Sequence, residues 1–85
     1  MHLIKINAMW CPSCLIMNNT YEKIAKEFNL KLETLDYDMD EEKVKSLDIG
    51  DVLPVLIVYK DDREILRIIG EQSYKHIEQK IGELL

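Results

Sequence analysis

Trp10-Cys11-Pro12-Ser13-Cys14 is the stretch of this chain that decides its fold, and the chemistry follows from it. Its two cysteines are the only ones among 85 residues. An apolar, β-branched run precedes the stretch, and a sequence with helical periodicity follows it. Backbone N–H groups at a helix start stabilise a thiolate, so two thiols at such a junction can close a short disulfide and reopen it. We interpret the pair as a thiol–disulfide exchange site, with Cys11 as the nucleophile and Cys14 as the resolving thiol.

The segments on both sides of the motif predict alternating strands and helices. We expect a strand at 2–7, a helix at 12–28, a strand near a sheet edge at 31–37, a helix at 41–47, strands at 54–59 and 64–69, and a last helix after Ser73. A β-α-β unit is parallel with a right-handed crossover, whereas Asp61 and Asp62 turn the last two strands into a hairpin. The fold class is therefore α/β, a four-stranded mixed sheet in the order β-α-β-α-β-β-α flanked by three helices. Residues 1–85 then form one domain, with Cys11 at the carboxyl end of the first strand.

Residue types near the expected helix ends indicate where three helices begin or end. Pro12 suits the first helical position, because its missing N–H needs no partner there. Asp40 is a candidate N-cap for the second helix, which we expect to end near Gly50. Ser73 is a candidate N-cap for the last helix.

The charge and hydropathy of the chain argue against two kinds of partner, nucleic acids and membranes. The net charge is −5, and residues 31–62 hold ten acidic and four basic side chains. This acidic middle argues against nucleic acid, which requires a cationic face. No apolar stretch reaches the length of a membrane span, and no signal peptide precedes the first strand, so we expect no membrane association. Two cysteines so close in sequence cannot hold a fold together by a disulfide, which favours the reducing cytoplasm as the compartment. We expect the protein to be a monomer.

At this point the chain resembles the thioredoxin/glutaredoxin superfamily in a minimal form, and the resemblance covers nearly all of it. Residues 8–14 resemble the W-C-x-x-C motif of that family. Val52-Leu53-Pro54 resembles the hydrophobic-proline pair that opens its third strand, and Ile69-Gly70 with Ser73 resembles the V-G and S before its final helix. The resemblance implies the thioredoxin fold, a redox-active centre and a role in electron transport and cell redox homeostasis.

The resemblance also implies how a substrate would bind. In the family the proline at position 54 is cis and faces the sulfurs, and the residue before it hydrogen-bonds an extended substrate. We therefore expect substrate contact from the residues that surround Cys11, namely Trp10, Pro12, Leu53, Pro54 and Gly70. Trp10 is interpreted as an apolar platform beside the nucleophile.

Lys5 is the clearest departure from the family pattern. Six residues before the first cysteine, the thioredoxin branch has a buried Asp, whereas this chain has Lys5. One interpretation is a side chain that snorkels at the sheet margin. The other is a cation that reaches Asp36 or Cys14, where it would tune the pKa of the thiols. The sequence does not decide between them.

The leading hypothesis is an enzyme, a thiol–disulfide oxidoreductase that acts on disulfide-containing protein substrates. It needs no metal and no organic cofactor, because two sulfurs with distant His2 and His76 do not make a zinc site. An external reductase of the thioredoxin-reductase kind, or glutathione, would supply electrons. Three alternatives stay open: a glutaredoxin-like, glutathione-dependent reductase, a non-enzymatic module that holds a metal or Fe–S cluster through the same thiols, and an adaptor that binds a partner without turnover.

Overall fold

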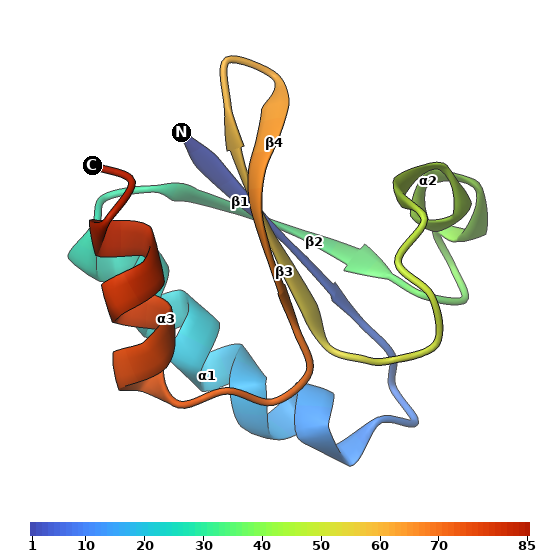
Figure 1. The fold of residues 1–85 in the computed structure, drawn as a ribbon. Coiled ribbons are helices and arrows are strands. Elements are labelled where there is room, and N and C mark those ends of the chain that lie inside the picture. The colour runs from blue at the N-terminus through green and yellow to red at the C-terminus, as the bar shows by residue number, and fades with distance from the viewer.

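The computed structural model describes residues 1–85 as a central sheet with helices on both faces (Figure 1). The elements in chain order are β1 (His2–Asn7), α1 (Pro12–Glu27), β2 (Lys31–Asp36), α2 (Glu41–Leu47), β3 (Val55–Lys60), β4 (Arg63–Ile69) and α3 (Tyr74–Gly82). This is the predicted order of strands and helices, with boundaries that differ by a residue or two. None of the helices is both long and apolar enough to cross a membrane.

The sheet has the strand order β2-β1-β3-β4. β1 pairs with β2 in parallel and with β3 antiparallel, and β3 pairs antiparallel with β4. The edge position predicted for the second strand is confirmed, and β1 and β3 are interior strands. The predicted mixed α/β sheet is therefore confirmed.

Two apolar clusters fill the space on the two faces of the sheet. On one face, α1 and α3 lie side by side and pack against Leu3, Leu56 and Val58 (Figure 1). On the other face, α2 contributes Val44, which packs against Ile6, Leu35 and other strand residues. Side chains alternate along a strand, so β3 contributes residues to both clusters. Because both of its faces are buried, its sequence is apolar without interruption.

The predicted hairpin between the last two strands is present. Asp61 and Asp62 have φ angles of 53° and 64°, the left-handed conformation that a two-residue type I′ turn requires at both positions. Aspartate tolerates this region because its short side chain can bond to nearby backbone groups. The turn therefore fixes the register of the first pairs, Lys60 with Arg63 and Tyr59 with Glu64, and a one-residue shift follows between Tyr59 and Val58.

The helix ends confirm one predicted cap and correct another. The Ser73 side chain accepts a hydrogen bond from the N–H of His76 over 3.1 Å, as predicted for the start of α3. Asp40 precedes α2, but its carboxylate accepts from the N–H of Asp36 over 2.8 Å instead of capping the helix. It stabilises the turn between β2 and α2. α2 ends at Leu47, the last residue predicted for it, and Asp48, with a φ of 52°, terminates the helix in the left-handed conformation in place of Gly50.

Candidate functional site

The dithiol motif lies where β1 ends and α1 begins. Cys11 is the N-cap residue of α1, and Pro12 takes the first helical turn as predicted. The N–H of Cys11 donates to the carbonyl of Ala8 over 3.2 Å, which closes a turn between strand and helix. Cys14 follows one helical turn later, so both sulfurs lie at the same end of the helix.

The two thiols are free, and the backbone of Cys14 contacts the sulfur of Cys11. The N–H of Cys14 donates to Sγ of Cys11 over 3.3 Å. Cys11 is 7 % exposed and Cys14 is 1 % exposed, so Cys11 is the more accessible sulfur. A backbone N–H that points at a sulfur favours its thiolate form, and the positive end of the helix acts in the same direction. Cys11 is therefore the outer of the two sulfurs and Cys14 the inner one.

Burial affects the inner thiol most strongly. Loss of solvation raises the pKa of Cys14 to about 11, and the neighbouring Cys11 adds to the rise. At neutral pH this thiol is therefore protonated. The inner sulfur then needs to lose its proton before it can attack a disulfide.

The segment before β3 faces the dithiol. The Leu53–Pro54 peptide bond is cis, as the family resemblance implied. Leu53 packs against the small cluster of Ala8, Cys11 and Cys14. Hydrogen bonding joins this segment to the end of β4, because the N–H of Gly70 donates to the carbonyl of Pro54 over 2.7 Å. The structure thus brings Leu53, Pro54 and Gly70 together beside the motif.

Trp10 is held at the surface by two residues that follow β2. Its Nε1 donates to a carboxylate oxygen of Asp38 over 2.7 Å, and its ring meets the ring of Tyr37 edge to face at 6.0 Å. Trp10 remains 62 % exposed. Tyr37 also packs against the cysteine cluster, so one tyrosine links the indole to the sulfurs.

Sequence reasoning missed Tyr37 and Asp38 as neighbours of the site. A usable signal existed, because β1 and β2 are parallel and their carboxyl ends meet at the same edge of the sheet. The register pairs Asn7 with Asp36, the last residues of the two strands. Residues that follow each strand are therefore expected to converge.

Several large apolar side chains are exposed in the segments that surround the motif. They are Met9, Trp10, Leu15, Val52 and Ile69. Scattered exposed apolar residues need no explanation, but these come from segments that converge on the dithiol. Such a rim suits contact with another protein's backbone and side chains.

Lys5 corrects two sequence-based expectations. It lies on the interior strand β1 and is only 6 % exposed, so it does not snorkel at a sheet margin. Its Nζ donates to Oδ1 of Asn18 over 3.2 Å, and it forms no ion pair with Asp36. Asp36 lies opposite Asn7, and its carboxylate instead accepts from the N–H groups of Asp38 and Met39.

The predicted non-site histidines lie away from the motif. His2 stacks on Tyr59 with ring centroids 5.1 Å apart, at the far end of β1. No group of three or more His, Cys, Asp and Glu side chains is arranged so that it could hold a metal ion.

Comparison with known proteins finds sequence similarity to thioredoxins over nearly the whole chain. The family profile described as thioredoxin matches residues 1–83. A thioredoxin of Alicyclobacillus acidocaldarius is 26% identical over 84 residues, which cover 98% of this chain and 80% of that protein. A thioredoxin of Staphylococcus aureus is 25% identical over 98% of this chain and 81% of its own length.

Solved structures agree with the sequence relatives. The thioredoxin of Trypanosoma brucei brucei superimposes with a TM-score of 0.86 at 26% identity, over 98% of this chain and 73% of that one. Thioredoxin 1 of Thermosipho africanus has the same fold, with a TM-score of 0.83 at 20% identity over 99% of this chain and 93% of its own.

Proposed function

The chain belongs to the thioredoxin family and is a thiol–disulfide oxidoreductase, and we propose that its activity resides in the Cys11/Cys14 pair. The observation that carries this proposal is the hydrogen bond from the Cys14 N–H to Sγ of Cys11 at the start of α1. This hydrogen bond gives the more accessible of the two sulfurs a backbone donor. The remaining roles follow from the positions around it.

The proposed reaction transfers two electrons from the dithiol to a substrate disulfide. The Cys11 thiolate attacks one substrate sulfur, the substrate S–S bond breaks, and the other substrate sulfur leaves as a thiolate that takes up a proton. A mixed disulfide now joins Cys11 to the substrate. Cys14 loses its proton and attacks Sγ of Cys11, which releases the second substrate thiol and leaves a Cys11–Cys14 disulfide.

Substrate contact is assigned to the surface around Cys11. Trp10 and Pro12 flank the nucleophile in sequence, and Leu53 packs against the cysteine cluster. Pro54 and Gly70 are joined by their backbone hydrogen bond and continue the same edge. We assign an extended segment of a disulfide-containing protein to this edge, because a backbone needs both polar partners and apolar contact.

An external dithiol reductase of the thioredoxin-reductase kind is the proposed electron source, with glutathione as the alternative. Either donor would act in the reducing cytoplasm, on a monomer of this one domain. The two donors are distinguished by supplying each in turn with NADPH and its own reductase and measuring which one sustains turnover. The oxidised Cys11–Cys14 disulfide is the substrate in both assays.

Reduction of insulin disulfides with dithiothreitol as the final donor tests the proposal. The parent protein is expected to accelerate the reaction, and Cys11→Ser is expected to abolish the acceleration. Thermal unfolding of the variant provides the control for correct folding. A folded Cys11→Ser protein as active as the parent would show that the reaction runs elsewhere.

A further inference from the structure

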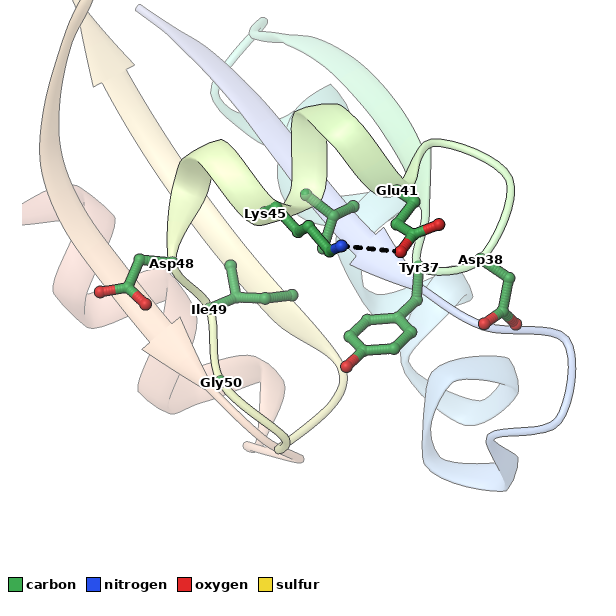
Figure 2. Close-up of a pocket in the computed structure, with 8 residues that line it drawn as sticks. Tyr37, Asp38, Glu41, Lys45, Asp48, Ile49 and Gly50 are labelled. Carbon is green, nitrogen blue, oxygen red and sulfur yellow. Dashed lines mark ion pairs between the residues drawn. The ribbon is translucent and has the colours of Figure 1, made fainter.

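A hollow of about 380 Å³ lies beside α2, lined by residues of the segment that joins β2 to β3 (Figure 2). Its apolar lining consists of Tyr37, Val44 and Ile49. Figure 2 shows the Tyr37 ring and the Ile49 side chain reaching into the same space from opposite sides. Val44 and Ile49 are almost fully buried, so they form a fixed floor. The volume lies in the range of small ligand pockets and suits one long side chain.

This hollow shares a wall with the redox site. Tyr37 lines the hollow and also packs against the cluster of Ala8, Cys11 and Cys14. Asp38 lines it as well, and its carboxylate accepts the hydrogen bond from the Trp10 indole. A substrate that lies over Trp10 therefore passes the mouth of the hollow.

The charges around the hollow are mostly negative. Three of the lining residues, Asp38, Glu41 and Asp48, are acidic, and Lys45 is the one cation among them. Lys45 is paired with Glu41 at 2.9 Å, and both side chains are exposed. Arg67 lies nearby, donating to the carbonyl of Asp48, but it is paired with Glu64. An excess of negative charge remains at the mouth.

An apolar floor with an acidic rim fits one kind of side chain, a long aliphatic stem that ends in a cation. The stem would lie on Val44 and Ile49, and the charged end would face the carboxylates. The Tyr37 ring adds an attraction for a cation over its face. An acidic side chain would meet repulsion from the same rim.

We propose that this hollow is a specificity subsite that binds a lysine or arginine side chain of the substrate protein, close in sequence to its reactive cysteine. This assignment rests on the proposed function, because the subsite acts only if a substrate disulfide docks at Cys11. It predicts that disulfides flanked by basic residues are reduced faster than those flanked by neutral or acidic ones.

Three disulfide-closed peptides test the proposal, identical except for Lys, Gln or Glu at the residues that flank both cysteines. Their kcat/KM values with the parent protein are divided by their rates with dithiothreitol alone, because flanking charge changes the reactivity of any disulfide. We expect the corrected value for the Lys peptide to exceed that for the Gln peptide about three- to tenfold. The Glu peptide is expected to be the slowest.

Two double variants distinguish an effect of the charges at the hollow from an effect of the protein's overall negative charge. Glu41→Gln with Asp48→Asn removes two rim charges, and asparagine tolerates the left-handed backbone at position 48. Glu22→Gln with Glu83→Gln removes the same charge from exposed positions on α1 and beyond α3. The Lys preference is expected to fall toward one in the rim variant only. An equal preference in both double variants would overturn the subsite.

Binding measured without turnover keeps the two proposals apart. A Lys peptide with serines in place of both cysteines is expected to shift the amide NMR signals of Tyr37, Ile49 and Gly50. Its failure to shift them would overturn the subsite even if insulin reduction proceeds. Shifts at these amides in a protein that reduces neither insulin nor peptides would support the subsite and refute the Cys11/Cys14 mechanism.

Discussion

The ammonium group of Lys5 donates a hydrogen bond to Oδ1 of Asn18 over 3.2 Å, and this contact ties the interior strand β1 to helix α1. Nδ2 of Asn7 donates to the same oxygen, also over 3.2 Å. Asn18 lies four residues after Cys14, so the two share one face of the helix. The buried Lys5 side chain is therefore joined to the helix one turn after the residue that carries the inner thiol.

Lys5→Met tests whether this cation affects the dithiol. Removal of a nearby positive charge destabilises a thiolate, so we expect the already raised pKa of Cys14 to rise further by about half a unit, roughly 0.7 kcal/mol. NMR of carbon-labelled cysteine across a pH series measures the change. Lys23→Met, at an exposed position of α1, is the matched control. Superimposable curves for parent and Lys5→Met would restrict Lys5 to a structural role.

Tyr21 carries a hydroxyl group that is fully buried and has no hydrogen-bond partner. A buried polar group without a partner costs about 1–3 kcal/mol, and phenylalanine removes it without changing the shape of the ring. We therefore expect Tyr21→Phe to raise the free energy of unfolding by about 1 kcal/mol in urea titrations.

Tyr74→Phe provides the control for that measurement. The Tyr74 hydroxyl donates to Glu27 at the surface, and this hydrogen bond raises the pKa of Tyr74 to about 12. Loss of an exposed contact is expected to change stability little. A clear loss of stability in Tyr21→Phe would indicate that the Tyr21 hydroxyl has a partner, such as a buried water molecule.

The fold was predictable because its strongest signals are local. Pro54–Tyr59 is an uninterrupted apolar run, and Asp61-Asp62 is a turn sequence between two strands. Helix ends were harder to place from sequence. Asp40 has the residue type of an N-cap, yet its carboxylate bonds to the N–H of Asp36, a choice that depends on how the chain turns after β2.

The site was predictable where the motif itself carries the chemistry, at Cys11 and Cys14. Its surroundings were not, because they come from the segment after β2, which is distant in sequence. Tyr37 and Asp38 carry no motif, and only the pairing of β2 with β1 brings them beside Trp10. Lys5 shows the same limitation. Its partner Asn18 lies on another element, and hydrophobic patterning gives no sign of that contact.

The raised pKa of Cys14 predicts how the stability of the reduced protein depends on pH. A free thiol titrates near 9.0, whereas folding raises the pKa of Cys14 to about 11, so between these values the folded state holds the proton more tightly. Stability is therefore expected to fall as pH rises through this window, by up to about 1.4 kcal/mol per pH unit. Urea titrations from pH 8 upward measure the slope.

Cys14→Ser removes the titrating thiol and serves as the reference for that slope. Burial also raises the pKa of Tyr21, which contributes in the same direction at higher pH, and the comparison separates the two groups. The slope near pH 10 is expected to be shallower in Cys14→Ser. Parallel slopes for parent and variant would mean that the Cys14 thiol titrates alike in folded and unfolded chains.

We also expect the Cys14→Ser variant to trap the mixed disulfide between Cys11 and the substrate. Cys11 can still attack a substrate disulfide in this variant, but no second thiol is present to resolve the mixed disulfide. Mass spectrometry after a single encounter with a disulfide peptide is expected to show the protein mass increased by one reduced peptide chain less two hydrogen atoms. Cys11→Ser is expected to form no adduct, because Cys14 is only 1 % exposed.

The parent protein should populate the same adduct briefly, with a lifetime set by pH. Burial, the largest cause of the raised pKa of Cys14, persists in the adduct, so only a small fraction of this thiol is ionised at neutral pH. That fraction rises about tenfold per pH unit, and the rate of resolution should rise with it. Acid-quenched samples from pH 6 to 9 are expected to contain progressively less adduct. An adduct level independent of pH would show that Cys14 delivers its proton to a group that ionises outside this range.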